Sequence, residues 1–195
     1  MVREGNGAMR KLVYGMNVTA DGYVSAPGDD IGWGVPSDEL FQFWLDEELA
    51  IGLFLYGRRL WEGMNAHWPT ADQLPDAAPA QIEFSRNWRD TPKVLFSSTV
   101  EKADWNTRVF GGDAVAEIAR LKADNGEPMR VGGSTLAAAA MRAGLIDEFT
   151  IVTHPVLVGG GKRFFTDLDT GVELDLVETR TFAGGVVMTR YETKR

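Results

Sequence analysis

The chain has 195 residues, of which 44% are hydrophobic and 25% are charged. These are ordinary values for a globular protein, so they exclude wholesale disorder, and the length is enough to bury a real core. The net charge of −8 argues against a protein that coats nucleic acid or an anionic membrane, and the absence of cysteine excludes disulfides and thiolate metal sites.

The first residues are too polar for a signal peptide, so we expect residues 1–9 to be a frayed leader or residues added in cloning. We expect a single domain over residues 10–195. No apolar run approaches the roughly 18–20 residues of a transmembrane helix, so we expect a cytoplasmic protein with no membrane partner. Only two histidines are present, and we expect no metal site.

Hydrophobic periodicity predicts strands and helices in alternation along the chain. A first strand is expected over residues 12–18, followed by a loop over 19–36 that is long enough to be functional. A helix then begins at residues 36–39, with Ser37 or Asp38 as its cap.

The later elements continue this alternation and end in two adjacent strands. In chain order we expect a strand at 51–56, a short helix near 60–65, a loop at 67–80, a helix at 81–89, a strand at 93–96, a strand edge at 109–110, a helix at 113–122, a strand at 129–131, a helix at 134–142, a strand at 149–153, and a hairpin of strands at 174–182 and 186–191. This order predicts a single three-layer α/β domain with a mostly parallel central sheet and an antiparallel C-terminal hairpin.

Three segments share one pattern, in which a strand ends, the backbone turns sharply and a helix or turn begins. Glycine lets the backbone approach a ligand, and a helix N-terminus offers free N–H groups to an anion such as a pyrophosphate. Each segment alone is more often a simple tight turn, and none matches the Rossmann or Walker fingerprint. Together they favour a binding site. Its candidate residues are Gly57, Arg58, Arg59, Ser97, Ser98, Gly132, Gly133 and Ser134.

A second candidate is Asp38, a carboxylate in the first turn of a helix and close in sequence to Trp33 and Trp44. Such a carboxylate can hydrogen-bond the amidine-like edge of a heterocycle or help to deliver a proton. Capping of the helix dipole is an equally good interpretation of the same spacing. His154, beside a proline at a strand end, is interpreted as structural.

Several ordered segments resemble the dihydrofolate-reductase-like superfamily, and most closely the branch represented by the reductase domain of riboflavin biosynthesis. The resemblance covers nearly the whole chain. The segments that carry it are residues 19–24, 55–62, 131–134, 145–149 and 154–161. One departure is Leu60, which stands where the family has a threonine whose hydroxyl binds phosphate.

The resemblance implies NADPH as the hydride donor, held by the eight candidate residues above, and a planar nitrogen heterocycle as substrate. It further implies that Asp38 is the substrate-facing catalytic acid, with Thr153 as its partner, and that the protein is a homodimer. The leading expectation is a reductase of the 5-amino-6-(5-phosphoribosylamino)uracil type. Dihydrofolate reductase activity and a non-catalytic nucleotide- or ligand-binding protein remain as alternatives.

Overall fold

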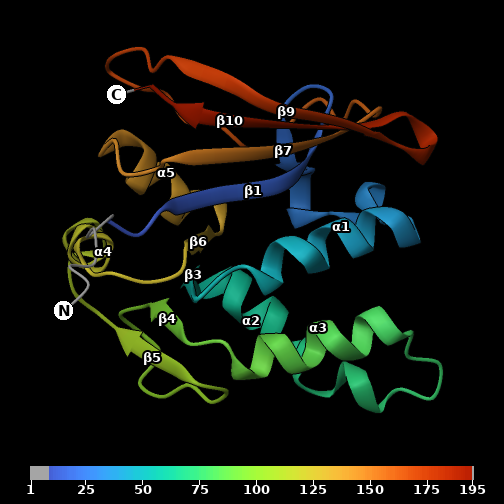
Figure 1. The fold of residues 1–195 in the computed structure, drawn as a ribbon, viewed down its shortest axis with the longest axis horizontal. Helices are drawn as coiled ribbons and strands as arrows, with labels where there is room; N and C mark the ends of the chain where they lie inside the picture. The colour runs from blue at the N-terminus through green and yellow to red at the C-terminus, as the bar shows by residue number, and fades with distance from the viewer. Residues whose placement is uncertain (1–8, 195) are drawn as a thin grey trace, which may run out of the picture.

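The computed structural model describes residues 9–194 (Figure 1). The expected leader at residues 1–9 therefore lies, except for Met9, outside the described residues.

An eight-stranded sheet forms the centre of the described chain, with the strand order β5-β4-β3-β6-β1-β7-β10-β9. The first six strands in this order pair in parallel, whereas β10 is antiparallel to both β7 and β9. The strands are β1 (Leu12–Thr19), β3 (Leu53–Gly57), β4 (Lys93–Phe96), β5 (Thr107–Phe110), β6 (Met129–Gly132), β7 (Glu148–His154), β9 (Leu174–Phe182) and β10 (Val186–Thr193).

Helices cover both faces of this sheet (Figure 1). Helices α4 and α5 pack on one face through Ile118, Leu136 and their apolar neighbours, and α1, α2 and α3 pack on the other. None of the helices within residues 9–194 is long and apolar enough to cross a membrane. The helices are α1 (Asp38–Leu49), α2 (Arg58–His67), α3 (Pro79–Asp90), α4 (Ala114–Ala123) and α5 (Ser134–Arg142).

The three-layer α/β architecture with a mostly parallel sheet and an antiparallel C-terminal hairpin is therefore confirmed. The strand at 93–96 and the helix at 134–142 have the predicted bounds. These segments are correctly predicted because their apolar periodicity is unbroken and a turn residue ends each one.

The expected loop over residues 19–36 is partly wrong. It contains a short strand, β2 (Tyr23–Ser25), which pairs with β8 (Lys162–Arg163), followed by two single turns of 3₁₀ helix at Pro27–Asp29 and Gly32–Gly34. A strand of three residues is too short to show a period of two, and its partner is far away in the sequence.

Two boundaries between residues 57 and 80 also differ from the prediction. Helix α2 begins directly after β3 and extends to His67, and a 3₁₀ helix over Trp68–Gln73 takes up much of the expected loop at 67–80. Helix α3 starts two residues early, at Pro79, because proline is well tolerated in the first helical turn.

Helix α1 is held against the sheet by apolar contacts at one end and by ion pairs at the other. Leu40 and Phe43 pack on Val152, Phe182 and Met188 of the sheet. This contact places the start of α1 beside the carboxyl end of β7.

The ion pairs lie towards the end of α1. Arg190 on β10 donates to both carboxylate oxygens of Glu47, at 2.8 and 3.2 Å, and to Glu148 on β7 at 3.0 Å. Arg130 on β6 lies 3.3 Å from Glu48, and burial raises the pKa of that carboxyl group. Because these ion pairs join α1 to two different strands, β10 and β6, both its position and its rotation about its own axis are defined.

We expect Arg190→Met to lower the free energy of unfolding by about 3–5 kcal/mol, because it leaves the half-buried carboxylates of Glu47 and Glu148 without this cation. Urea denaturation would measure the loss. Arg86→Met is the matched control, because Arg86 is exposed and should change the value by at most about 0.5 kcal/mol. Equal effects of the two substitutions would contradict a stabilising role for the cluster.

Candidate active site

The segments predicted to bind phosphate come together at one edge of the sheet. Strands β4, β3 and β6 are neighbours and run in parallel, so their carboxyl ends meet. In the register, Gly57 pairs with Phe96, and Tyr56 pairs with Gly132. The turns that begin at residues 57, 97 and 132 therefore lie side by side.

The two helices that directly follow β3 and β6 at this edge have no side-chain cap. Gly57 precedes α2 and Gly133 precedes α5, and glycine has no side chain to accept the first N–H groups. By contrast, Ser37 caps α1 through the N–H of Leu40, and Asp113 caps α4. The donors at the starts of α2 and α5 are thus available to an anion, which fits the phosphate groups of a nucleotide.

Two glycines allow these helix starts to approach each other closely. A Cβ atom at Gly132 would lie 2.7 Å from both Leu60 Cδ2 and Tyr56 Cδ1. Gly133 has φ +94°, a conformation that favours glycine, and a Cβ there would lie 3.6 Å from Leu60. The leucine that replaces the family's threonine therefore packs across the two glycines of the β6 turn.

The two arginines at the start of α2 are exposed and engaged in ion pairs. Arg58 donates to both carboxylate oxygens of Glu62, one helical turn later, at 2.8 and 3.1 Å. Arg59 lies 3.8 Å from Asp29, in the segment between β2 and α1. Such exposed pairs contribute only about 0–1 kcal/mol, so a phosphate can replace the carboxylates at little cost.

The serines after β4 differ in their surroundings. The hydroxyl oxygen of Ser97 accepts from the N–H groups of Thr99 and Val100, at 3.2 and 3.1 Å, and so closes its own turn. Ser98 is exposed at the same edge. The structure thus places both serines with the other predicted phosphate-binding residues, but Ser97 also has a local role.

Asp38 lies in the first turn of α1 with its side chain exposed, and the cap of that helix is Ser37. Thr153 is on β7, beside Val18 of β1 in the register. Side chains alternate along a strand, and Val152 faces α1. Thr153 therefore points away from the helix that carries Asp38. The orientation of its side chain on β7 does not favour the expected contact between Asp38 and Thr153.

The β7 residue that faces α1 at the carboxyl edge is His154, which its sequence position beside a proline indicated only as structural. Its side chain is buried, and its ring meets that of Trp33 at a centroid distance of 5.4 Å. Burial lowers the pKa of His154, so the imidazole is neutral at neutral pH. Side chains alternate along β7, but this alternation shows that His154 faces α1 only once it is known which face of the sheet α1 covers.

The segment after β1 is attached to the segment after β7. The carboxylate of Asp21 accepts from the N–H groups of Val158 and Gly159, the latter at 2.7 Å. A Cβ at Gly161 would lie 1.9 Å from the carbonyl oxygen of Ser25, so only glycine fits there. The glycine run at 159–161 thus allows two loops to pack at the carboxyl edge.

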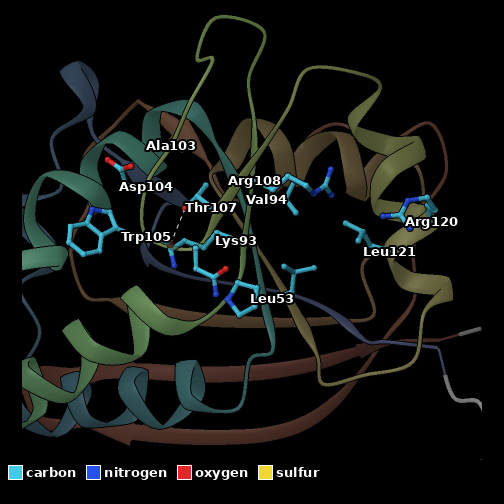
Figure 2. A pocket seen from close by; sticks show the side chains of 12 residues that line it. Leu53, Lys93, Val94, Ala103, Asp104, Trp105, Thr107, Arg108, Arg120 and Leu121 are labelled. Carbon is cyan, nitrogen blue, oxygen red and sulfur yellow. Dashed lines mark hydrogen bonds between the residues drawn. The ribbon is translucent and has the colours of Figure 1, made fainter.

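A separate pocket of about 570 Å³ lies at the opposite edge, where β3, β4 and β5 begin (Figure 2). Its cationic groups already have partners within the protein. The ammonium of Lys93 donates to the carbonyl oxygen of Thr91 at 2.7 Å, and Arg108 and Arg120 both bind Glu117. The Arg120 hydrogen bond lowers the pKa of Glu117 to about 2. We therefore place the candidate site at the carboxyl edge.

Comparisons with known proteins agree with this architecture. The model of the RibD C-terminal domain family matches residues 10–188. The uncharacterized protein YyaP of Bacillus subtilis (strain 168) is 30% identical over 185 residues, which cover 93% of this chain and 94% of that protein.

Two solved structures share the fold at 18% sequence identity. A putative riboflavin biosynthesis protein from Shewanella sp. PV-4 superposes with a TM-score of 0.74 over 95% of this chain and 99% of its own. A dihydrofolate reductase from Enterococcus faecalis, solved with NADP(H) and RAB-propyl, superposes with a TM-score of 0.63 over 95% and 97%.

We expect Gly132→Ala to destabilise the protein by about 1–3 kcal/mol, because the added methyl group overlaps Leu60 and Tyr56. The matched control is Gly63→Ala within α2, where a Cβ meets nothing within 4 Å. That change should stabilise the helix by about 0.5–1 kcal/mol. Urea denaturation of both variants is the measurement, and changes of the same sign would contradict the close packing at residue 132.

Proposed function

The chain belongs to the RibD C-terminal domain family, and we propose on that premise that it is a cytoplasmic NADPH-dependent reductase of a heterocyclic substrate. The substrate is aminopyrimidine- or pteridine-like, as in 5-amino-6-(5-phosphoribosylamino)uracil reductases. The observation that carries the proposal is the pair of uncapped helix N-termini at the adjacent carboxyl ends of β3 and β6.

The residues at this edge suit a phosphorylated dinucleotide. Backbone N–H groups at the starts of α2 and α5 would bind the pyrophosphate, and Ser134 lies in the first turn of α5. Arg58 and Arg59 supply positive charge and forked donors, which suit the additional phosphate that distinguishes NADPH from NADH. The chain has a net charge of −8, so an anionic cofactor needs a local positive charge. Arg58 and Arg59 supply it.

When bound, the nicotinamide supplies the hydride, and the protein supplies position and surroundings. Asp38 lies in the first turn of α1 with its side chain exposed. From there it would accept hydrogen bonds from the heterocycle and orient the ring. Ser37 already caps this helix, which leaves the Asp38 carboxylate for the substrate.

Two alternatives have specific support. Dihydrofolate reductase activity is favoured by Asp38, because a carboxylate that is not the helix cap suits the amidine edge of a pterin. A non-catalytic binding protein is favoured by Leu60, because its side chain packs over Gly132 where the family has a phosphate-binding hydroxyl. Turnover of dihydrofolate, compared with that of the aminouracil, separates the two enzymes, and saturable NADPH binding without turnover of either would favour the third.

We also propose a homodimer formed through the edge strand β9. Nearly all of its residues are exposed, including Leu176 and Val177, which are 58% and 53% exposed. A long edge strand with apolar side chains is a template for pairing with another chain, and a second copy carries the same strand.

The functional test is the binding of NADPH and NADH to arginine variants. We expect Arg58→Ala and Arg59→Ala each to weaken NADPH binding about 10- to 100-fold, because a charge-assisted hydrogen bond is lost, and to leave NADH binding almost unchanged. Fluorescence of the reduced nicotinamide gives both dissociation constants, and Arg86→Ala is the exposed control. Equal losses for the two nucleotides would contradict the assignment to the additional phosphate, and no saturable NADPH binding by the wild type would contradict the function.

The dimer is tested by Val177→Lys, which places a charge on β9. We expect the wild type to sediment as a dimer and the variant as a monomer, because the substitution makes burial of this strand unfavourable. Analytical ultracentrifugation measures both. Thr170→Lys, in the exposed segment before β9, also adds one positive charge and should leave the dimer intact. A monomeric wild type would refute the proposal.

A further inference from the structure

A single carboxylate at the carboxyl edge is shared by two cations from different elements. Oδ1 of Asp29 forms an ion pair with the ammonium of Lys162 on β8, and Oδ2 lies 3.8 Å from Nη1 of Arg59 on α2. Among residues 9–194, Asp29 is the only acidic partner of either cation. One negative charge thus faces two positive charges, so the two cations are not fully neutralised.

The backbone presents this carboxylate at the tip of a tight turn. Asp29 has φ +63°, a left-handed conformation that is uncommon outside glycine, and it directly follows Gly28 with φ +81°. The N–H of Ala26 donates to the carbonyl oxygen of Asp30 at 2.8 Å and closes the turn. A side-chain-bearing residue held in this conformation beside a candidate site points to a role for its side chain.

The two cations are placed by their backbones and not by the ion pairs. Lys162 pairs with Ser25 of β2 in the register, and a Cβ at the preceding Gly161 would lie 1.9 Å from the carbonyl oxygen of Ser25. Arg59 lies in the first turn of α2. We therefore expect each backbone to keep its place when one of the three charges is removed.

The arrangement has the chemistry of a phosphate site. Phosphate oxygens accept the same charge-assisted hydrogen bonds from ammonium and guanidinium groups as carboxylate oxygens do. A phosphate monoester carries about 1.5 to 2 negative charges at neutral pH, so it matches two cations better than a carboxylate does. The site also adjoins the uncapped start of α2, whose first N–H groups favour an anion.

We propose that Arg59 and Lys162 form a phosphate-binding site and that Asp29 is its internal pseudo-ligand, which an incoming phosphate displaces. Lys162 thereby gains a binding role. The identity of the phosphate rests on the proposed function, in which Arg59 binds the additional phosphate of NADPH. Because Asp29 occupies the site in the free protein, it lowers the apparent affinity for that phosphate.

The test uses variants at the two ends of one ion pair. The probes are adenosine 2′,5′-bisphosphate and adenosine 5′-monophosphate, and calorimetry at low ionic strength, where exposed charges are least screened, measures their binding. Asp29→Asn removes the competitor, and we expect it to strengthen binding of the bisphosphate about three- to fivefold. Lys162→Met removes a cation, and we expect it to weaken that binding about tenfold. Binding of the monophosphate should change much less in both variants.

The opposite signs distinguish a pseudo-ligand from an ordinary structural ion pair. Both substitutions break the contact between Asp29 and Lys162, so a purely structural role predicts that both weaken binding of the bisphosphate. Weaker or unchanged binding in Asp29→Asn, or unchanged binding in Lys162→Met, would overturn the proposal.

Two further substitutions control for the change in net charge. Asp124→Asn removes an exposed carboxylate at the end of α4, and Lys194→Met removes an exposed ammonium after β10. Each of these groups also belongs to an exposed ion pair, and we expect neither substitution to change binding of the bisphosphate by more than about twofold. Effects as large as those at Asp29 and Lys162 would show a general electrostatic effect and overturn the proposal.

Carbon-13 magnetic resonance of the Asp29 carboxyl group gives a second readout. In the free protein, the hydrogen bond from Lys162 and the charge of Arg59 hold the pKa of Asp29 below its usual value. A phosphate that takes both cations removes this effect and adds a negative charge nearby, so we expect the pKa of Asp29 to rise when the bisphosphate is bound. A pKa of Asp29 that stays low in the saturated protein would overturn the displacement.

The outcomes also separate this proposal from the proposed function. If ribose 5-phosphate responds to the two substitutions with opposite signs and the bisphosphate does not, the pseudo-ligand stands and the assignment of Arg59 to NADPH fails. If the wild type binds NADPH but neither phosphate compound responds with opposite signs, the pseudo-ligand is refuted and the reductase stands.

Discussion

Parallel pairing of strands β4, β3, β6, β1 and β7 is the constraint on which the candidate site depends. Parallel neighbours place all of their carboxyl ends at one edge, so turns from distant parts of the chain meet there. The pairing of Tyr56 with Gly132 brings the starts of α2 and α5 together, and that of Thr19 with His154 places the end of β7 beside β1. The pocket at the amino ends of β3, β4 and β5 lies at the opposite edge for the same reason.

The second constraint is the orientation of α1. Buried ion pairs define this orientation, although moving their charges out of water costs free energy. Arg130 is 6% exposed, and burial raises the pKa of its neighbour Glu48. Such a buried ion pair stabilises the fold only where its geometry is maintained. Arg190 adds a bidentate contact with Glu47. With this end of α1 held, the other end, including Asp38, lies at the carboxyl edge of the sheet.

The helices differ in whether a side chain caps their first N–H groups. Ser37 and Asp113 cap their own helices with side-chain oxygens, whereas Gly57 and Gly133 cannot. Helix α3, which follows Ala78, has no side-chain cap either, but only α2 and α5 directly follow adjacent central strands. A missing cap therefore indicates an anion-binding edge only where parallel strand ends bring two such helix starts together.

The sequence by itself determined the type and order of most elements, because periodicity and turn residues are local properties, as the strand at 93–96 and the helix at 134–142 illustrate. It also located the glycines and arginines of the β3 and β6 turns. Only the tertiary structure decided which face of β7 meets α1. As a consequence, His154 rather than Thr153 faces the helix that carries Asp38. The pairing of β2 with β8 and the contact of Trp33 with His154 were likewise decided there. These features depend on contacts between residues far apart in the chain, which no local pattern encodes.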